Sequence, residues 1–147
     1  MSLESDFPQL KAVGFEQTSP PDSAYNCIAF AAGNTDRWWE PASDYYWPEG
    51  LPRDYTVATL TNLFEGLGYA VCPDGMYESG FEKVVIFEES GEYSHAARLV
   101  GRELWASKLG VNCDIQHRLE ALEGGIYGNH VKFLKRPAPL STEHRRT

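Results

Sequence analysis

The spacing of apolar and polar residues predicts a short helix close to the start of the chain. Its apolar positions fall at i, i+3, i+4 and i+7, the spacing of one helix face: Ala24, Cys27, Ile28 and Ala31. Asp22 or Ser23 can act as its N-cap, because both follow a pair of prolines, and Gly33 sits where a helix commonly ends. Cys27 is therefore expected in the first turn or so of this helix.

A second amphipathic helix is predicted over residues 56–67, between Thr56, which can cap it, and Gly68, which stops it. From there on the pattern is mostly that of strands. We expect strands over 69–72, 82–88, 93–100, 102–109 and 127–134, with a hairpin turn around Gly101. Asp114 is expected to cap one last short helix before the final strand.

This order of elements predicts one α+β domain over residues 1–147. The first segment, 1–21, has little periodicity and is interpreted as an extended arm. Residues 22–136 form the expected core. Residues 137–147 are expected to be a flexible tail.

An aromatic stretch follows the first helix and is interrupted by prolines, so a long loop is expected there. Its three indoles belong to Trp38, Trp39 and Trp47. They either form a groove wall beside Cys27 or fold over the core and cover it.

Composition limits the function classes. The formal net charge of −8 argues against a nucleic-acid partner, which would need a basic footprint. The chain has three cysteines, an odd number, so a closed disulfide framework is not expected. This favours a reducing, cytoplasmic setting. No apolar run has the length of a membrane span or the form of a signal peptide, so no membrane partner is expected.

The candidate chemistry is that of a thiol. A cysteine in the first turn of a helix meets free N–H groups and the positive end of the helix dipole, both of which favour the thiolate. His95, early in a predicted strand, is the candidate base, and we expect its ring to lie within hydrogen-bonding reach of Cys27. The alternative is that both residues are ordinary buried core positions.

The group that would orient His95 is the weak point of this site. Residues 104–109 of the strand after His95 offer no carboxylate or amide, so Ser107 or His117 is the expected partner of the second ring nitrogen. Register decides which side chain faces His95. One turn length pairs it with Lys108, and another pairs it near Leu109, with Ser107 and Trp105 on its face.

Two resemblances add to this interpretation. The motifs Asn26-Cys27-x-Ala29, His95-Ala96-Ala97-Arg98 and Ser107-Lys108-Leu109-Gly110 resemble an uncharacterised family of bacterial domains, over roughly 26–136. The Cys27 and His95 pair in this element order resembles the core of papain-like hydrolases of the CHAP and NlpC type. That second resemblance implies a papain-like fold, in which the Cys27 helix packs on a small antiparallel sheet.

The sequence therefore predicts a thiol hydrolase or acyl-transfer domain acting on a peptide or another amide-bearing substrate, with Cys27, His95, Ser107 and His117 as catalytic candidates. The expected substrate contacts are Asn26, Trp38, Trp39, Trp47, Trp105 and Lys108. No metal or other cofactor is expected, because no cluster of His and Cys has ligand spacing. The alternative function is a non-catalytic binding or regulatory module that recognises a protein partner.

Overall fold

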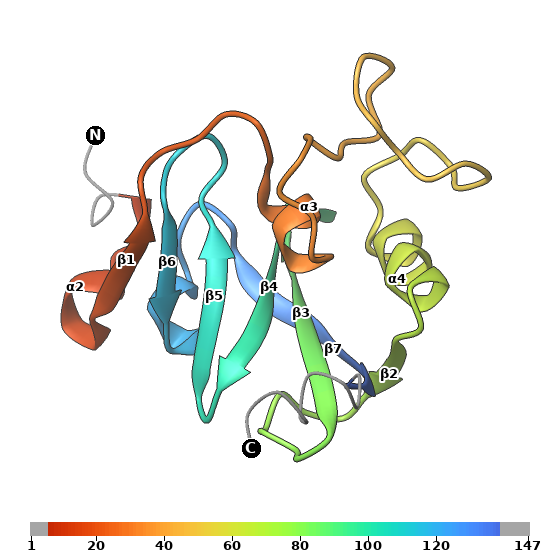
Figure 1. The fold of residues 1–147 in the computed structure, drawn as a ribbon. Helices are drawn as coiled ribbons and strands as arrows, with labels where there is room; N and C mark the ends of the chain where they lie inside the picture. Colours follow the sequence, from red (N-terminus) through yellow and green to blue (C-terminus); the bar gives the residue numbers. More distant parts are fainter. Residues whose placement is uncertain (1–5, 139–147) are drawn as a thin grey trace.

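Residues 6–138 are described by the computed structural model, in which seven strands form one antiparallel sheet ordered β1-β6-β5-β4-β3-β7-β2 (Figure 1). The strands are β1 (Phe15–Ser19), β2 (Ala70–Cys72), β3 (Phe81–Glu89), β4 (Glu92–Gly101), β5 (Leu104–Lys108), β6 (Asp114–His117) and β7 (Asn129–Pro137). The helices are short: α2 (Leu10–Val13), α3 (Cys27–Ala31), α4 (Val57–Gly66) and the 3₁₀ turn η1 (Leu119–Leu122).

The centre of the sheet is the part that the sequence predicted best. The continuous apolar run of β3 lies between β4 and β7, where both of its faces are covered. The expected hairpin joins β4 to β5, and the register places Arg98 opposite Ala106. Because side chains alternate along a strand, this register puts Trp105 and Ser107 on the same face as His95 and Ala97.

The sheet separates two apolar layers. On one face α3, α4 and the loop between them cover a layer that includes Val84, Ile86 and Ala96. On the other face α2 and η1 cover a layer that includes Val85, Phe87 and Ala97. Successive side chains of β3 and β4 therefore point alternately into the two layers, so each side chain on these strands belongs to one layer or the other.

The helices follow simple capping rules. Thr56 caps α4 by accepting a hydrogen bond from the N–H of Thr59, as expected. Helix α3 begins later than predicted, because Asn26 is its N-cap in place of Asp22 or Ser23. Cys27 is consequently the first residue of the helix.

The predicted papain-like α+β fold, with a helix packed on a small sheet, is wrong. The sheet dominates the chain, and α3 has only 5 residues. The error arose because two neighbouring strands at one side of the sheet, β1 and β6, were not recognised. Part of the expected arm forms α2 and β1, and β1 pairs with β6.

Two further expectations need correction. Asp114 does not cap a helix, because residues 114–117 form β6, in which Asp114 accepts hydrogen bonds from the hydroxyls of Ser19 and Tyr25. The chain beyond Leu134 continues β7 as far as Pro137. The rest of the expected tail, 139–147, lies outside the described residues.

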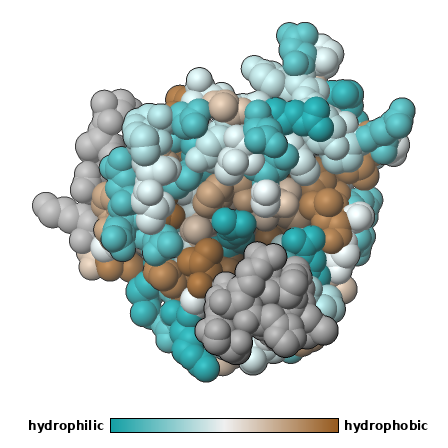
Figure 2. Space-filling model, in the orientation of Figure 1, coloured by the Kyte–Doolittle hydropathy of each residue, from teal (hydrophilic) through white to brown (hydrophobic). Residues whose placement is uncertain are grey.

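The loop between α3 and α4 projects from the body of the molecule at the upper right of Figure 1. In the space-filling view this projection is pale to teal, whereas brown hydrophobic residues form a band beneath it (Figure 2). Within residues 6–138, no helix has the length and apolar character needed to cross a membrane.

Candidate functional site

Asn26 fixes the start of α3 and ties it to the aromatic loop. Its side-chain oxygen accepts hydrogen bonds from the N–H of Ala29 (3.2 Å) and of Trp39 (3.1 Å). Its amide nitrogen donates to the carbonyl of Trp39 at 2.7 Å. All of its side-chain polar atoms are thus used within the chain, so Asn26 holds Cys27 and the loop in a fixed relation.

Cys27 lies where the helix meets the sheet. Its side chain is 9% exposed. Burial raises the pKa of its thiol to about 11, although hydrogen bonds from the main-chain N–H groups of Ala96 and Ile28 act in the opposite direction. The free protein therefore holds a protonated thiol at neutral pH, with N–H groups in place beside the sulfur.

A hollow of about 220 Å³ opens beside Cys27. Aromatic rings dominate its lining, and one carboxylate, that of Glu40, lies among them. Its lining residues include Asn26, Cys27, Trp38, Glu40, Tyr55, Tyr93, Ser94 and Tyr127. The hollow is therefore built from α3, the aromatic loop, the start of β4 and the segment before β7.

A buried chain of hydrogen bonds links three neighbouring strands. Ser107 Oγ on β5 lies 2.9 Å from His95 Nε2 on β4 and 2.7 Å from His117 Nε2 on β6. The Nδ1 atom of His117 lies 2.7 Å from the carbonyl oxygen of Arg118, which can only accept. The expected contact of His95 with Ser107 is present, and His117 reaches His95 through Ser107.

The expected contact between Cys27 and His95 is not formed as a hydrogen bond. Among residues 6–138, the Nδ1 atom of His95 has no hydrogen-bond partner, and it is buried. The His95 ring packs edge-on against Phe87 in the second layer, whereas Cys27 belongs to the first. The link between the two residues is indirect: the main-chain N–H of Ala96, the residue after His95, lowers the pKa of the Cys27 thiol.

Tyr127 connects the two groups. Its ring stacks on the His95 ring, with centroids 4.1 Å apart and planes 5° apart, and Tyr127 also lines the hollow beside Cys27. Burial lowers the pKa of His95 well below its usual value, and the neighbouring His117 adds to this effect. The imidazole of His95 is therefore neutral.

The four tryptophans among the predicted substrate contacts divide into three groups. Trp38 lines the hollow, as the groove-wall interpretation expected. Trp39 and Trp47 lie in the core beneath it, as the covering interpretation expected. Trp105 belongs to the second layer and lines a different hollow, which it shares with Met76 and Phe133.

Lys108 is fully buried, and its ammonium group is engaged within the chain. It donates to the main-chain carbonyls of Asp22, Tyr25 and Gly110. These carbonyls belong to the segment before α3 and to the turn after β5. Lys108 thus anchors the approach to Cys27 to the sheet, and its role in substrate binding stays a prediction.

The family model of a domain of unknown function, DUF7689, matches residues 16–135. The chain belongs to this family. No curated protein and no solved structure was found to match it. The match agrees with the expected membership of an uncharacterised domain family, and both the hollow and the His95 chain lie within the matched DUF7689 segment.

Sequence reasoning missed four residues of the DUF7689 hollow: Glu40, Tyr55, Tyr93 and Tyr127. They come from two loops and a strand start, where no periodicity marks a side chain as facing a site. The one signal in the sequence was the density of aromatic residues in the segment that contains Trp38. It did not extend to the other residues of the hollow.

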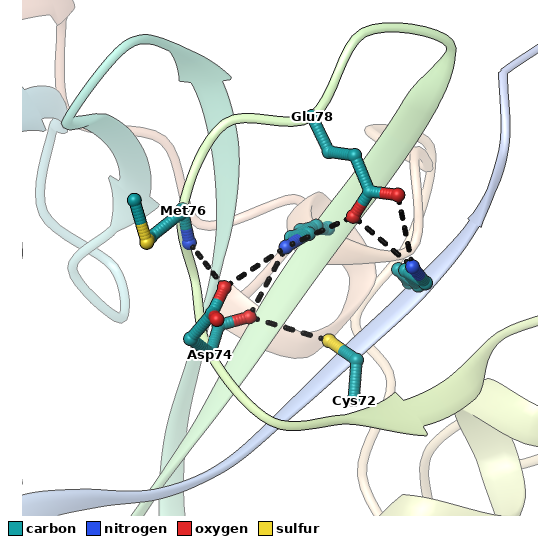
Figure 3. Close-up of polar contacts among 6 residues, drawn as sticks. Cys72, Asp74, Met76 and Glu78 are labelled. Atoms are coloured by element: carbon teal, nitrogen blue, oxygen red, sulfur yellow. Dashed lines mark hydrogen bonds and ion pairs between the residues drawn. The ribbon is translucent and has the colours of Figure 1, made fainter.

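The other cysteines of the DUF7689 domain have structural surroundings. Cys72 Sγ lies 3.3 Å from the carbonyl oxygen of Asp74, in a loop whose carboxylates Asp74 and Glu78 bind the buried ammonium of Lys83 (Figure 3). Cys113 is 2% exposed. Within the described part of the chain, no group of three His, Cys, Asp or Glu residues is arranged to hold a metal ion.

Proposed function

We propose that this domain is a thiol-dependent acyl-transfer protein that attacks an amide or ester through Cys27. The sulfur forms a bond to the substrate carbonyl carbon, and the thiol proton passes to His95 Nδ1. The bond from that carbon to the leaving nitrogen or oxygen then breaks, and the leaving group takes the proton. Water or an amine subsequently cleaves the thioester, giving hydrolysis or transfer.

The observation that carries this proposal is that Cys27 is the first residue of α3 and lines the hollow, with main-chain N–H groups that lower the pKa of its thiol. Such donors stabilise negative charge on sulfur or on a carbonyl oxygen undergoing attack. The Asn26 amide donates one hydrogen to the Trp39 carbonyl, and its second hydrogen can serve as a donor because Asn26 lines the hollow. The N–H groups at the start of α3 and this second amide hydrogen are the proposed donors.

His95 is the proposed base because its Nδ1 lone pair is unused. The hydrogen bonds through Ser107 and His117 hold the ring and place the proton of neutral His95 on Nε2. The proton transfer requires the sulfur and Nδ1 to come closer than they are in the free protein. Because burial opposes both the thiolate and the imidazolium, the chemical step is expected to be slow unless the substrate displaces water from the hollow as it binds.

The test is to trap the acyl intermediate. The protein is incubated with a panel of activated esters and peptide anilides, and its intact mass is measured after acid quenching. An adduct on Cys27 that hydroxylamine removes is the expected result. It should be absent in Cys27→Ser and unaffected in Cys72→Ser, the matched control for a structural thiol.

Further outcomes separate the base from the nucleophile. In His95→Gln the adduct should form more slowly while the far-UV circular dichroism stays unchanged. An adduct that forms equally in Cys27→Ser, or no adduct with any acyl donor of the panel, would exclude the acyl-transfer mechanism.

A second candidate function is a binding module without catalysis. The high pKa of the Cys27 thiol and the absence of a hydrogen bond from it to His95 among residues 6–138 favour this alternative. In that case the aromatic hollow would hold a ligand or a partner's side chain, and substitution of Cys27 by Ala would leave binding intact.

A further inference from the structure

The hollow beside Cys27 combines aromatic rings with a single carboxylate. Trp38, Tyr55, Tyr93 and Tyr127 contribute four aromatic rings, and Glu40 contributes the only charged side chain among the lining residues. Aromatic faces and a carboxylate attract the same class of ligand, an organic cation, because the ring quadrupole and the charge both present negative potential.

Glu40 is held in place by two of these aromatic residues. The indole N–H of Trp38 donates to Oε1 at 2.8 Å, and the hydroxyl of Tyr55 donates to Oε2 at 2.5 Å. Each carboxylate oxygen retains a further lone pair that can accept a hydrogen bond. Glu40 is thus a pre-positioned acceptor that needs no reorganisation when a donor enters the hollow.

The rings are also held by contacts with one another and with residues outside the lining of the hollow. Tyr93 stacks on Tyr55 (5.6 Å between centroids) and lies parallel to Trp47 (6.5 Å). One face of Tyr127 is covered by His95. The aromatic side chains are therefore supported from behind, as a preformed binding site requires.

The surrounding charges favour a cation. Asp54 and Glu92 lie close enough to the tyrosines of the hollow to affect their pKa values. The ammonium hydrogens of Lys108 are directed at three main-chain carbonyls. Of the arginines in the aromatic loop, Arg37 lies over the Tyr46 ring and Arg53 donates to the Ala42 carbonyl, so both are engaged within the loop. The chain as a whole carries a formal net charge of −8. A positively charged ligand is therefore attracted both locally and at long range.

From this arrangement we propose that the hollow binds an alkylammonium group, with Glu40 as its hydrogen-bond acceptor and the rings of Trp38, Tyr55, Tyr93 and Tyr127 as its apolar and cation–π walls. The inference rests on the proposed function in one respect: the ammonium would belong to the substrate whose carbonyl Cys27 attacks. Recognition at Glu40 would then set the substrate class as amides that carry a basic side chain.

Binding is tested without chemistry, in the full-length Cys27→Ala protein. Isothermal titration calorimetry and ¹H–¹⁵N NMR are used with three probes: N-acetyl-lysine methylamide, its neutral analogue N-acetyl-norleucine methylamide, and n-butylamine. The lysine derivative should bind at least about tenfold more tightly than the norleucine derivative, because the latter lacks the charge. Equal binding of the two amides, or no binding of either amine, would overturn the proposal.

The variant that tests the acceptor is Glu40→Gln, which keeps the shape of the side chain and removes its charge. It should weaken the lysine probe about tenfold and leave the norleucine probe unchanged. Glu49→Gln is the matched control, because Glu49 is an exposed residue of the same loop that does not line the hollow. An equal effect of both substitutions would show general charge attraction only and would contradict a site at Glu40.

The source of the ammonium is distinguished by the third probe. Similar affinities for n-butylamine and the lysine derivative would assign the hollow to free amines, whereas a clear preference for the lysine derivative would assign it to peptide side chains. Both results support an alkylammonium site.

Failure of this inference and failure of the proposed function have different signatures. Lysine-selective binding without an acyl adduct on Cys27 would support the ammonium site and contradict the acyl-transfer mechanism. An acyl adduct that forms equally from lysine and norleucine esters would support the acyl-transfer mechanism and contradict the ammonium site.

Discussion

His95 Nε2 lies 2.9 Å from Ser107 Oγ, and the direction of this hydrogen bond is set by a third residue, His117. The Nδ1 atom of His117 faces a carbonyl, so it carries the proton, and Nε2 of the neutral ring is an acceptor. The Ser107 hydroxyl must then donate to His117. Its oxygen is left to accept from His95 Nε2, so Nδ1 of His95 bears no proton.

The first prediction is therefore a pair of opposite tautomers. At pH 7.5, long-range ¹H–¹⁵N correlation spectra should show His95 as the Nε2–H form and His117 as the Nδ1–H form. The resonances are assigned with His95→Gln and His117→Gln. Finding His95 as the Nδ1–H tautomer would reverse the hydrogen bonds and remove its lone pair from any role as a base.

The second prediction concerns pH and stability. Burial lowers the pKa of both His95 and His117 in the folded state, whereas in the unfolded chain each returns to about 6.5. Below about pH 6.5 the unfolded chain binds more protons than the folded protein, so the free energy of unfolding falls as the pH decreases. Above about pH 6.5 the two histidines leave the free energy of unfolding unchanged. The limiting slope is about 1.4 kcal/mol per pH unit for each histidine.

Urea unfolding between pH 7.5 and pH 5 measures this slope while the carboxylates remain mostly ionised. In His117→Gln the slope should fall to about half. A free energy of unfolding that is constant over this range would mean that the two histidines are accessible to protons in the folded protein.

The third prediction concerns Asn26. Replacing it with Ala removes three hydrogen bonds and leaves the main-chain groups of Ala29 and Trp39 without these partners, at a cost of about 2–4 kcal/mol in the free energy of unfolding. Asn26→Asp keeps the two acceptor contacts and loses the donor to the Trp39 carbonyl, so its cost should be intermediate. If the Ala variant lost less than about 0.5 kcal/mol, Asn26 would not be the link between α3 and the aromatic loop.

The central strands could be predicted because their signal is local. The apolar run of β3, the alternation in β4 and the Gly101 turn each specify one element. The edge strand β1 could not, because its side chains are almost all exposed and its stability comes from main-chain pairing with β6. Asp114 is a good helix cap in isolation, but the hydroxyls of Ser19 and Tyr25 bind it within a strand.

The candidate site likewise has contacts that the sequence could predict and contacts that it could not. The contact of His95 with Ser107 depends only on one hairpin register, and the sequence offered few alternatives for it. The placement of Cys27 relative to His95 depends on which face of the sheet α3 covers, and a helix with apolar residues on most sides does not reveal this. Glu40 and Tyr55 are brought together by a long loop, for which no periodic pattern exists.

The fourth prediction concerns the reactivity of Cys27. With its pKa raised to about 11 by burial, the rate of its alkylation by iodoacetamide should rise about tenfold per pH unit between pH 7 and pH 10, without a plateau at pH 8–9. Cys27 should still be labelled before Cys72 and Cys113, because it lines an open hollow. Peptide mapping after partial alkylation gives the order of labelling, and Cys27→Ser identifies its signal. A plateau below pH 9 would show that an imidazole or another cation stabilises the thiolate in the free protein, so that His95 approaches the sulfur more closely in solution. Protection of Cys27 until the protein unfolds would instead make the thiol a core residue and exclude it as a nucleophile.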